Sequence, residues 1–473
     1  MIVEEKEIIE TLPASDLPTD WRLETIGGLV AKDGVFVDGD WIESKDQDPN
    51  GDVRLIQLAD IGDGFYRNRS DRYLTYDKAI ALGCTFLKKG DVLIARMPDP
   101  LGRACIFPGD SKKAVTAVDV CIVRPDRKDI DNHWLMFFVN APAFRAAVAS
   151  LQSGSTRKRI SRSNLAKIQI PVPPAHEQKR IVAEIEKQFS RLDEAVAGLK
   201  RVKANLKRYK AAVLKAAVEG RLVETEAEST RREGRSYESG EQLLRRILEE
   251  RRSQWKGKGK YKEPAAPETN GLPELPEGWV WASVDQLIAH LTDGDHQPPP
   301  QTDQGIPFLV IGNVRNGEID FSDTRFVGEA YYRSLDPYRQ PKKGDLLYTL
   351  VGSYGIPVRV KTDQPFCIQR HMAILRPHKK SPMSYLTLAM ASDSIFKQAT
   401  AVATGTAQKT VPLSGLRKIA IPLPPEAEQA RIVTEVDRRL SLVREAESQI
   451  IVNLKRAERM QKGILNNVFT GKL

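Results

Sequence analysis

The sequence contains very little cysteine. Cys84, Cys105, Cys121 and Cys367 are the only four cysteines in 473 residues, and none belongs to a CxxC pair. This scarcity excludes a disulfide framework, gives no sign of a zinc site and fits a reducing compartment. No apolar run approaches the roughly 18 residues of a membrane span. The acidic start MIVEEKEIIE lacks the basic and apolar regions of a signal peptide. We therefore expect a cytoplasmic chain with no membrane segment.

The usual catalytic motifs are also missing. GKGK at 257–260 lacks the Ser or Thr and the glycine spacing of a phosphate loop. No GxGxxG follows an expected strand, and there is no HExxH zinc motif or Asn/Asp-Pro-Pro-aromatic tetrapeptide. DGDH at 293–296 could in principle bind a metal, but a turn-forming loop is the alternative. We expect no catalysis and no metal site in this chain.

The charge balance is modestly positive. Lys and Arg number 72 against 62 Asp and Glu, which gives a net charge of +10. Such a balance favours phosphate-bearing partners only where the charge is localised. Apolar residues make up 41% of the chain, enough for a sizeable core, which excludes a mostly disordered protein.

Three segments of the first half recur, in the same order, in the second half. LPTDW at 17–21 recurs as LPEGW at 275–279, and KKGDVL at 88–93 recurs as KKGDLL at 342–347. The longest match joins LAKIQIPVPPAHEQKRIVAEIE at 165–186 to LRKIAIPLPPEAEQARIVTEVD at 416–437. The shifts of 258, 254 and 251 residues far exceed the about 20–50 residues of a solenoid repeat. The chain is therefore a tandem repeat of a globular unit and a helix.

Each globular unit is predicted to be mixed α/β. β-rich runs in the first unit are VRLIQLADI at 53–61, GDVLIARM at 90–97 and DVCIVRP at 119–125. Those in the second are PFLVIGNV at 307–314, GDLLYTLV at 344–351 and HMAILRP at 371–377. Helical segments follow at 133–151 and 382–400. Gly90 and Gly344, in the KKGD motifs, are expected to form turns.

A long segment without proline follows each IPxPP motif, which is itself extended because proline disfavours a helical predecessor. The first runs from about His176 to Val218, and its apolar residues recur at steps of three and four, as in a coiled coil. They are Ile181, Ile185, Phe189, Leu192, Val196, Leu199, Val202, Leu206, Tyr209 and Val213. The second, less regular series is Ile432, Val436, Leu440, Val443, Ile450, Leu454, Ala457, Met460 and Ile464. A helix of about 43 residues would be about 65 Å long. The alternative is two separate amphipathic helices, each lying on its own domain.

The pairing of these helices decides how the domains are arranged. Parallel helices would place the globular units side by side, whereas antiparallel helices would place them at opposite ends, related by an approximate two-fold axis. Antiparallel pairing also leaves the end of the first helix near the start of the second unit, so we favour it. The predicted fold class is α+β: two similar mixed α/β domains separated by two long antiparallel coiled-coil helices.

The sequence divides into five parts. We predict a first globular domain at 1–175, a first long helix at 176–220, a linker at 221–272, a second globular domain at 273–425 and a second long helix at 426–473. The linker contains a predicted short helix, EQLLRRILEERRSQW at 241–255, and then KGKGKYK at 256–262. The basic run is either a solvated linker or a phosphate-binding arm.

The repeated motifs carry a family resemblance. A tandem of LPxxW, KKGDxL and IPxPPxxEQxRIV, with a long helix after each, resembles the specificity (S) subunit of Type I restriction–modification enzymes. The resemblance covers nearly the whole chain and is most specific in the IPxPPxxEQxRIV block. It implies two target-recognition domains, each of which reads one half of a split site in double-stranded DNA. It also implies paired helices that set the gap between half-sites and dock two methyltransferase (M) subunits and, indirectly, the restriction (R) subunits. S-adenosylmethionine, ATP and Mg²⁺ would belong to those partners, so this chain is expected to be non-catalytic and to hold no cofactor.

The resemblance places a DNA-facing loop just before each IPxPP block. These loops are SGSTRKRIS at 153–161 and TGTAQKTV at 404–411. The predicted DNA-binding residues are Arg157, Lys158, Arg159, Gln408 and Lys409, with Arg96, Arg103, Ser353 and Tyr354 in two further turns, and Gln297 as a weaker candidate. Arginine can bind phosphate or guanine through two hydrogen bonds, and glutamine can read adenine. Ordinary basic surface loops are the alternative.

The resemblance also predicts a partner surface at the start of each long helix. Gln178 and Arg180 recur as Gln429 and Arg431, and we expect them to bind M subunits; capping and solvation of the first turn is the alternative. Two other functions stay open. A fused restriction–methylation enzyme would need a methyltransferase motif, and a coiled-coil adaptor without specific DNA recognition would show no salt-sensitive DNA binding.

Overall fold

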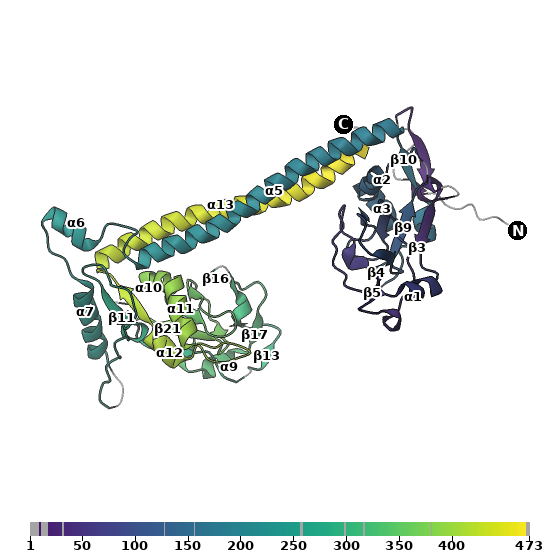
Figure 1. The fold of residues 1–473 in the computed structure, drawn as a ribbon. Helices are drawn as coiled ribbons and strands as arrows, with labels where there is room; N and C mark the ends of the chain where they lie inside the picture. The colour runs from purple at the N-terminus through teal and green to yellow at the C-terminus, as the bar shows by residue number, and fades with distance from the viewer. Residues whose placement is uncertain are drawn as a thin grey trace. The chain divides into compact units, whose positions relative to one another are not determined.

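The structure, a computed structural model, describes residues 9–10, 18–30, 33–126, 128–155, 157–255, 259–297, 299–315, 317–379 and 381–469. The chain packs as two compact units (Figure 1). Unit 1 consists of Met1–Lys200 with Ile450–Leu473, and unit 2 consists of Arg201–Gln449. Both combine sheets and helices, so the predicted α+β fold class is confirmed.

Unit 1 is built around a four-stranded antiparallel sheet in the order β3-β9-β6-β7. Its strands are Val35–Asp38 (β3), Val120–Arg124 (β9), Val92–Ala95 (β6) and Ala104–Ile106 (β7). The smaller sheets are β5-β4-β8, from Tyr73–Leu74, Val53–Ile56 and Lys113–Thr116, and β1-β10-β2, from Ile9–Glu10, Ile168–Val172 and Arg22–Thr25. The helices are α1 (Tyr76–Ala81), α2 (Asn132–Val139), α3 (Pro142–Ser150) and α4 (Arg162–Ala166).

The central sheet of unit 1 is buried on both faces. Val92 and Ile94 of β6 pack with Trp134 and Phe138 of α2, which lies with α3 beside the sheet in Figure 1. Leu93, between them in sequence, faces a separate core on the other side. This double burial explains why the strand sequence is a continuous apolar run rather than an alternating one.

Unit 2 repeats the strand order of the central sheet, while its other sheets differ in strand number. Its four-stranded sheet has the order β12-β21-β18-β19, from His290–Asp293, Met372–Arg376, Leu346–Thr349 and Pro357–Arg359. Its other sheets are β13-β17-β14-β20 (Gln301–Thr302, Arg325–Val327, Ile306–Leu309, Cys367–Ile368), β11-β22 (Val280–Ser283, Ala420–Leu423) and β15-β16 (Val314–Arg315, Glu318–Ile319). The matching strand orders support the repeat predicted from the sequence.

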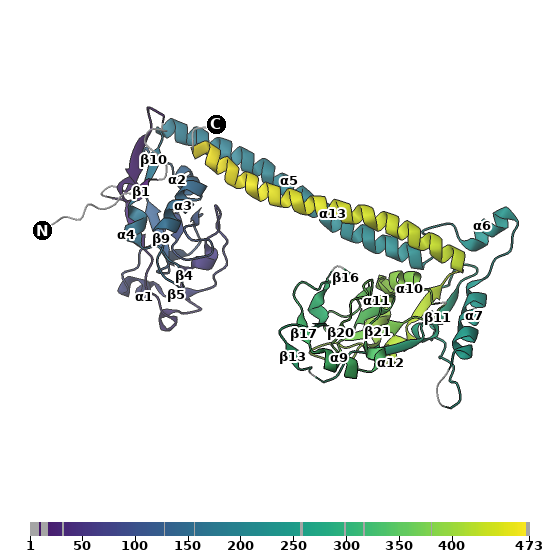
Figure 2. The same cartoon turned by 180° about the vertical axis from the view of Figure 1, so that it is seen from behind.

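Helices cover one face of the unit 2 sheet (Figure 2). These are α10 (Met383–Met390) and α11 (Asp393–Val402), while α8 (Val284–Leu287), α9 (Glu329–Ser334) and α12 (Leu413–Lys418) are shorter. The predicted helical segment at 382–400 is therefore two helices, and so is the segment at 133–151. In unit 1 the break precedes Pro142, which begins α3 and cannot continue α2.

The repeated KKGD motif forms a turn held by an ion pair. The glycine of each motif has positive φ, 93° and 96°, which confirms the predicted turns. Asp91 is buried and pairs with Arg124 at 2.6 Å, and the equivalent Asp345 pairs with Arg376 at 2.8 Å. Each arginine is the last residue of the neighbouring strand, so the motif fixes the register of β6 on β9 and of β18 on β21.

Two long helices follow the IPxPP segments. Helix α5 spans Ala175–Val218 and α13 spans Glu426–Phe469, 44 residues each, or about 65 Å at about 1.5 Å per residue. No helix among the described residues is both long and apolar enough to cross a bilayer.

The long helices pack against each other inside each unit. In unit 1, Ile181 and Ile185 near the start of α5 share a core with Val468 and Phe469 at the end of α13. In unit 2, the end of α5 shares a core with the start of α13, through Val213, Leu214, Ala217, Val218, Ile432 and Val436. The helices therefore run antiparallel, as predicted.

Three residues that we predicted to lie in the apolar seam are exposed instead. Val202 and Tyr209 of α5 are 47% and 44% exposed, and Met460 of α13 is 48% exposed. These side chains follow the spacing of a coiled coil but lie on open helix surface, because the sequence period alone does not say which face is covered.

The linker contributes two helices to unit 2. Helix α7 (Gly240–Ser253) was expected, but α6 (Glu226–Glu233) was not. The signal for α6 is a capping box in which Thr225 and Glu228 each accept a backbone hydrogen bond from the other, with Gly234 in the left-handed conformation at the end. Residues 256–258 of the basic run lie outside the described residues.

Candidate nucleic-acid interface and helix starts

A short hairpin stands at the same place in both units. Ser153 and Arg159 exchange two backbone hydrogen bonds of 2.8 and 2.9 Å, and Thr404 and Thr410 exchange two of 2.8 Å. The second residue of each hairpin is a glycine with φ of 95° or 97°. A Cβ at these positions would lie 2.3 Å or 2.5 Å from a carbonyl oxygen of the same loop. Both turns therefore require glycine and have the same conformation.

The first hairpin presents three cationic side chains. Arg157, Lys158 and Arg159 are all exposed. Within the described part of the chain, no hydrogen bond or ion pair engages their charged groups. Exposed cations on one turn are well placed to bind phosphate oxygens. Thr156, in the same loop, lies outside the described residues.

The second hairpin borders a pocket of mixed polar and apolar lining. Gln408, equivalent to Arg157, lines a hollow of about 330 Å³ together with Asp293, Arg370 and His371. Lys409, the next residue, is exposed. An amide beside a guanidinium offers the donors and acceptors that base edges need. Arg370 was not predicted, since a single arginine before a strand gives no sequence signal.

An adjoining hollow extends this surface. It has a volume of about 230 Å³, shares Arg370 and His371 with the first pocket and is also lined by Gln297 and Arg325. Burial and the neighbouring Arg370 lower the pKa of His371, so its imidazole is neutral near pH 7. The weaker candidate Gln297 thus lies among residues that could contact a nucleic acid.

The corresponding surface of unit 1 carries Trp41. The triplet DGD at 38–40 recurs at 293–295, and its last aspartate forms a parallel bridge to the loop before β9 or β21. Trp41 therefore occupies the position of His296 in unit 2, and 71% of it is exposed, which is rare for tryptophan. The sequence analysis missed Trp41, although the repeated triplet was a signal for it.

The DGDH segment is held by hydrogen bonds. His296 Nε2 lies 2.9 Å from Asp293 Oδ2, and Tyr331 donates its hydroxyl to Asp295 over 2.7 Å. Burial opposes ionisation of Asp295, but this hydrogen bond and two backbone amides lower its pKa. Across the described residues, no three His, Cys, Asp or Glu side chains gather as metal ligands. The contacts of the segment are those of a hydrogen-bonded loop.

Arg103 and Arg96 point into their own domain. Arg103 is 3% exposed, and its guanidinium donates to four backbone carbonyls, at 2.7 to 3.1 Å. Burial lowers its pKa. Arg96 pairs with Asp38 at 3.1 Å and donates to the carbonyls of Ile160 and Val118. These placements argue against direct DNA contact, because the donors are already used to hold the loops together.

The two candidates in the VGSYG turn of unit 2, at 351–355, differ. Ser353 is exposed and stays a predicted DNA contact. Tyr354 stacks on Phe396 with ring centroids 5.3 Å apart, and its hydroxyl lies 3.0 Å from that of Thr400. Tyr354 therefore packs within unit 2, and this placement argues against a DNA contact.

Gln178 and Gln429 lie in the first turn of the long helices but face inward. They are 0% and 6% exposed. Each amide donates to the carbonyl of the proline five residues earlier, at 2.8 and 2.7 Å. Gln178 also accepts the backbone N–H of Asp131 over 2.7 Å. Their placement argues against partner contact, because the buried amides anchor each helix to its own domain.

Arg180 and Arg431 lie at the surface of the same helix starts. The side chain of Arg180 is 71% exposed and its only described ion pair is with Glu177 at 3.2 Å. Arg431 is 37% exposed and pairs with Glu226 of α6 at 2.6 Å. The two arginines are equivalent in sequence but have different partners, since α6 belongs to unit 2 and no described helix of unit 1 takes its place.

Comparisons with known proteins agree with this architecture. The sequence profile of the family described as "Type I restriction modification DNA specificity domain" matches residues 18–206 and 302–456. The chain is similar to the Type I restriction enzyme EcoBI specificity subunit of Escherichia coli, with 27% identity over 354 residues that cover 72% of this chain and 66% of that protein. It thus spans just under two thirds of that relative.

Two solved structures share the fold. One is a chain described in work on complex assembly and conformational transition of the type I R-M system, with a TM-score of 0.64, 18% identity and coverage of 97% of this chain and 99% of that chain. The other is the HsdS subunit from Thermoanaerobacter tengcongensis, with a TM-score of 0.52, 18% identity and coverage of 97% and 98%.

Proposed function

Because this chain belongs to the Type I restriction–modification DNA specificity family, we propose that it is the recognition subunit of such a complex in the cytoplasm. It reads a bipartite target in double-stranded DNA, with one half-site for each globular unit. The family assignment confirms the resemblance noted from the repeated motifs. The observation that carries the DNA-reading proposal is the same glycine-requiring hairpin at the same place in both units, with polar side chains at its tip.

The two hairpins contact DNA in different ways in this proposal. Arg157, Lys158 and Arg159 bind phosphates or guanine in the first half-site. Gln408 reads a base edge in the second, with Arg370 beside it and Lys409 on the phosphate backbone. Different side chains on one scaffold let two similar domains read two different sequences.

The long helices act as the spacer in this proposal. Half-sites are favourably read about one helical turn apart, roughly 34 Å, and a pair of antiparallel helices is stiff enough to make that separation part of the specificity. The support is the antiparallel packing found separately within each unit.

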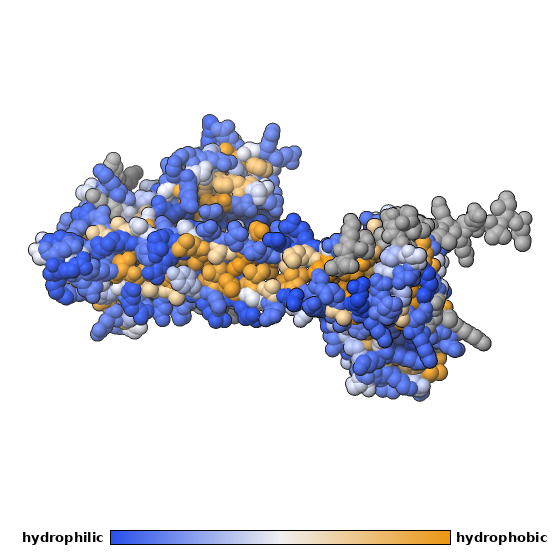
Figure 3. All heavy atoms as spheres, turned by 90° about the horizontal axis from the view of Figure 1, so that it is seen from above, coloured by the Kyte–Doolittle hydropathy of each residue, from blue (hydrophilic) through white to orange (hydrophobic). Residues whose placement is uncertain are grey.

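The chain itself is non-catalytic in this proposal and docks two M subunits and, through them, the R subunits. S-adenosylmethionine, ATP and Mg²⁺ then belong to those partners. Apolar side chains are exposed on α5 and α13, and Figure 3 shows apolar surface along the long helices. These side chains are Val202, Tyr209, Leu442, Ile451, Val452 and Met460. Exposed apolar surface of this kind is typical of a protein interface.

A domain exchange tests the DNA-reading proposal. Residues 1–175 are replaced by the corresponding segment of a relative with a different target, and the methylated sites of cells that carry the complex are sequenced. One half-site should change and the other should stay. A change in both half-sites would contradict the modular assignment. If the unmodified chain showed no salt-sensitive DNA binding, that result would favour an adaptor function instead.

A further inference from the structure

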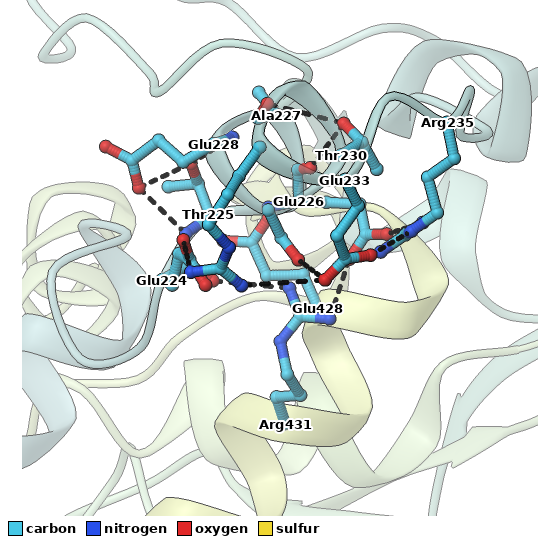
Figure 4. A network of polar contacts seen from close by, with 12 residues as sticks. Glu224, Thr225, Glu226, Ala227, Glu228, Thr230, Glu233, Arg235, Glu428 and Arg431 are labelled. Atoms are coloured by element: carbon cyan, nitrogen blue, oxygen red, sulfur yellow. Dashed lines mark hydrogen bonds and ion pairs between the residues drawn. The ribbon is translucent and has the colours of Figure 1, made fainter.

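The start of α13 is covered by the linker helix α6. The backbone N–H of Glu226, the first residue of α6, donates to Glu428 over 2.8 Å, and the Glu226 carboxylate pairs with Arg431 at 2.6 Å and with Arg235 at 2.6 Å. Figure 4 shows these side chains converging between α6 and α13. Glu226 is 1% exposed and Glu428 is 0% exposed, so the contact is closed to water.

The residues just before α6 complete this cover. Leu222 and Val223 pack on the core of unit 2 and, with Arg431 and Thr434, line a shallow hollow on α13. Gly220 lies so close to the start of the domain that an added Cβ would be 2.4 Å from Pro276 Cγ. The segment 220–235 thus binds the helix start through an apolar stretch, a helix N-terminus and a buried glutamate.

The equivalent start of α5 in unit 1 has no such cover from the residues that the structure describes. Trp21 and Glu177 repeat the contact of Trp279 with Glu428, at 3.0 against 3.1 Å. Among the described residues of unit 1, nothing takes the place of α6. Instead a pocket of about 610 Å³ is lined by Pro18, Trp21, Glu177, Arg180, Ile181 and Glu184, among others. The side chain of Glu177 keeps 19% of its surface exposed.

The arginine at this helix start has a different ion-pair partner from its equivalent in unit 2. Arg431 is turned toward the glutamate of α6, whereas Arg180 meets no such glutamate among the described residues and folds back onto Glu177. Glu177 therefore has a carboxylate oxygen that can accept a helix N–H in exchange for Arg180. Lys187 also lines the pocket, where it pairs with Glu184 at 3.3 Å.

We propose that the pocket around Trp21, Glu177 and Arg180 is a docking site for an acidic helical segment of a partner protein. The segment binds as residues 220–235 bind in unit 2. Its apolar residues contact Trp21 and Ile181, its first helical N–H donates to Glu177, and its first glutamate pairs with Arg180. The proposal deepens the partner-binding part of the proposed function, with which it shares Arg180, and does not depend on DNA recognition.

The probe is a peptide of residues 222–236 of this chain, LVETEAESTRREGRS, with a fluorescent label. The full-length protein is titrated with it in the absence of DNA and of other subunits, so a failure here is distinguishable from a failure of DNA reading. In the full chain the unit 2 site is occupied by α6, and we expect saturable binding at the unit 1 pocket.

Matched variants make the test specific. Arg180→Ala in the protein and Glu226→Gln in the peptide should each weaken binding about tenfold or more, as loss of a charge-assisted hydrogen bond does. Arg191→Ala, at an exposed position further along α5, should leave the affinity within about twofold, and a scrambled peptide should bind at least about tenfold more weakly.

Three results would overturn the proposal. One is the absence of saturable binding, and another is an affinity that Arg180→Ala leaves unchanged. The third is binding only to a chain that lacks residues 470–473, which would show that the occupant is the protein's own C-terminal segment. That segment repeats residues 219–222 in sequence, TGKL against EGRL.

Discussion

Trp279 donates its indole N–H to Glu428 over 3.1 Å, and this bond joins the start of the second globular domain to the first turn of α13. The same bond joins Trp21 to Glu177 in unit 1. It explains why the sequence repeats LPxxW and PPxxEQ together, although about 150 residues separate them: the two motifs form one contact. Burial raises the pKa of Glu428, so the indole donor stabilises a carboxylate that water does not reach.

Trp279→Phe should destabilise the protein more than Trp21→Phe. Both variants remove the indole N–H, but only Glu428 is fully buried, and an unsatisfied buried group costs about 1–3 kcal/mol. Glu177 is partly exposed and can be hydrated instead. Urea unfolding of the two variants measures the difference, and an equal loss of stability would contradict this interpretation of the two sites.

Acid should remove the stabilising contribution of Glu226 to the contact between α6 and α13. Burial opposes ionisation of Glu226, but hydrogen bonds from Arg431 and Arg235 outweigh it and lower the pKa from its ordinary value of 4.5. A carboxyl with a lowered folded-state pKa stabilises the fold fully above pH 4.5, and this stabilisation is lost as the pH falls through the folded-state value.

Glu226→Gln tests this dependence. At pH 7 it should cost about 1–3 kcal/mol, because it leaves two arginines without their buried partner. Its stability should also fall less on acidification below pH 4.5 than that of the parent chain. Glu241→Gln is the control, since Glu241 forms an exposed pair with Arg245 worth well under about 1 kcal/mol. Identical pH profiles of Glu226→Gln and the parent would count against the ion-pair network.

The first hairpin should carry part of the salt dependence of DNA binding. The double change Arg157→Ala and Lys158→Ala should weaken binding and reduce the slope of log K against log salt by about one for each phosphate that the hairpin no longer binds. Lys210→Ala, at an exposed position on α5, is the matched control. If the double variant had the same slope of log K against log salt as the parent chain, the placement of this hairpin in the DNA interface would be contradicted.

Trp41 should affect only one half of the target. The residue is 71% exposed, so Trp41→Ala should change folding stability by less than about 0.5 kcal/mol. If Trp41 contacts bases, discrimination at the first half-site should fall by about 1–3 kcal/mol, measured by competition with DNA altered in one half-site at a time. Equal effects on both half-sites would contradict the assignment.

The fold could be predicted from the sequence because its signals repeat. The IPxPP segments and the apolar periodicity located both ends of α5 within two residues and also the first residue of α13, and the repeated β-rich runs located β6, β9, β18 and β21. The capping box at Thr225 is a sequence signal for α6. The helix was still not predicted, because a short polar helix lacks the apolar periodicity that predicted the other helices.

The candidate sites were harder to predict, because burial is decided by tertiary packing. Arginine and glutamine usually lie at the surface. Arg103 and Gln178 are nevertheless buried, and they donate to backbone carbonyls from distant parts of the sequence. No local pattern distinguishes such an arginine from the exposed Arg157. Trp41 was missed for the opposite reason, since an isolated tryptophan is normally expected in a core.

The core of unit 1 is completed by Leu465, Val468 and Phe469, which come from the far end of the chain. The ring centroids of Phe469 and Phe138 lie 5.0 Å apart. Residues near the end of α5 likewise complete the core of unit 2. The two halves of the sequence are therefore interlocked rather than merely joined. A chain cut in the linker would yield fragments that each hold part of the other's interior, and such fragments should reassemble with one another or exchange helices with a neighbouring molecule.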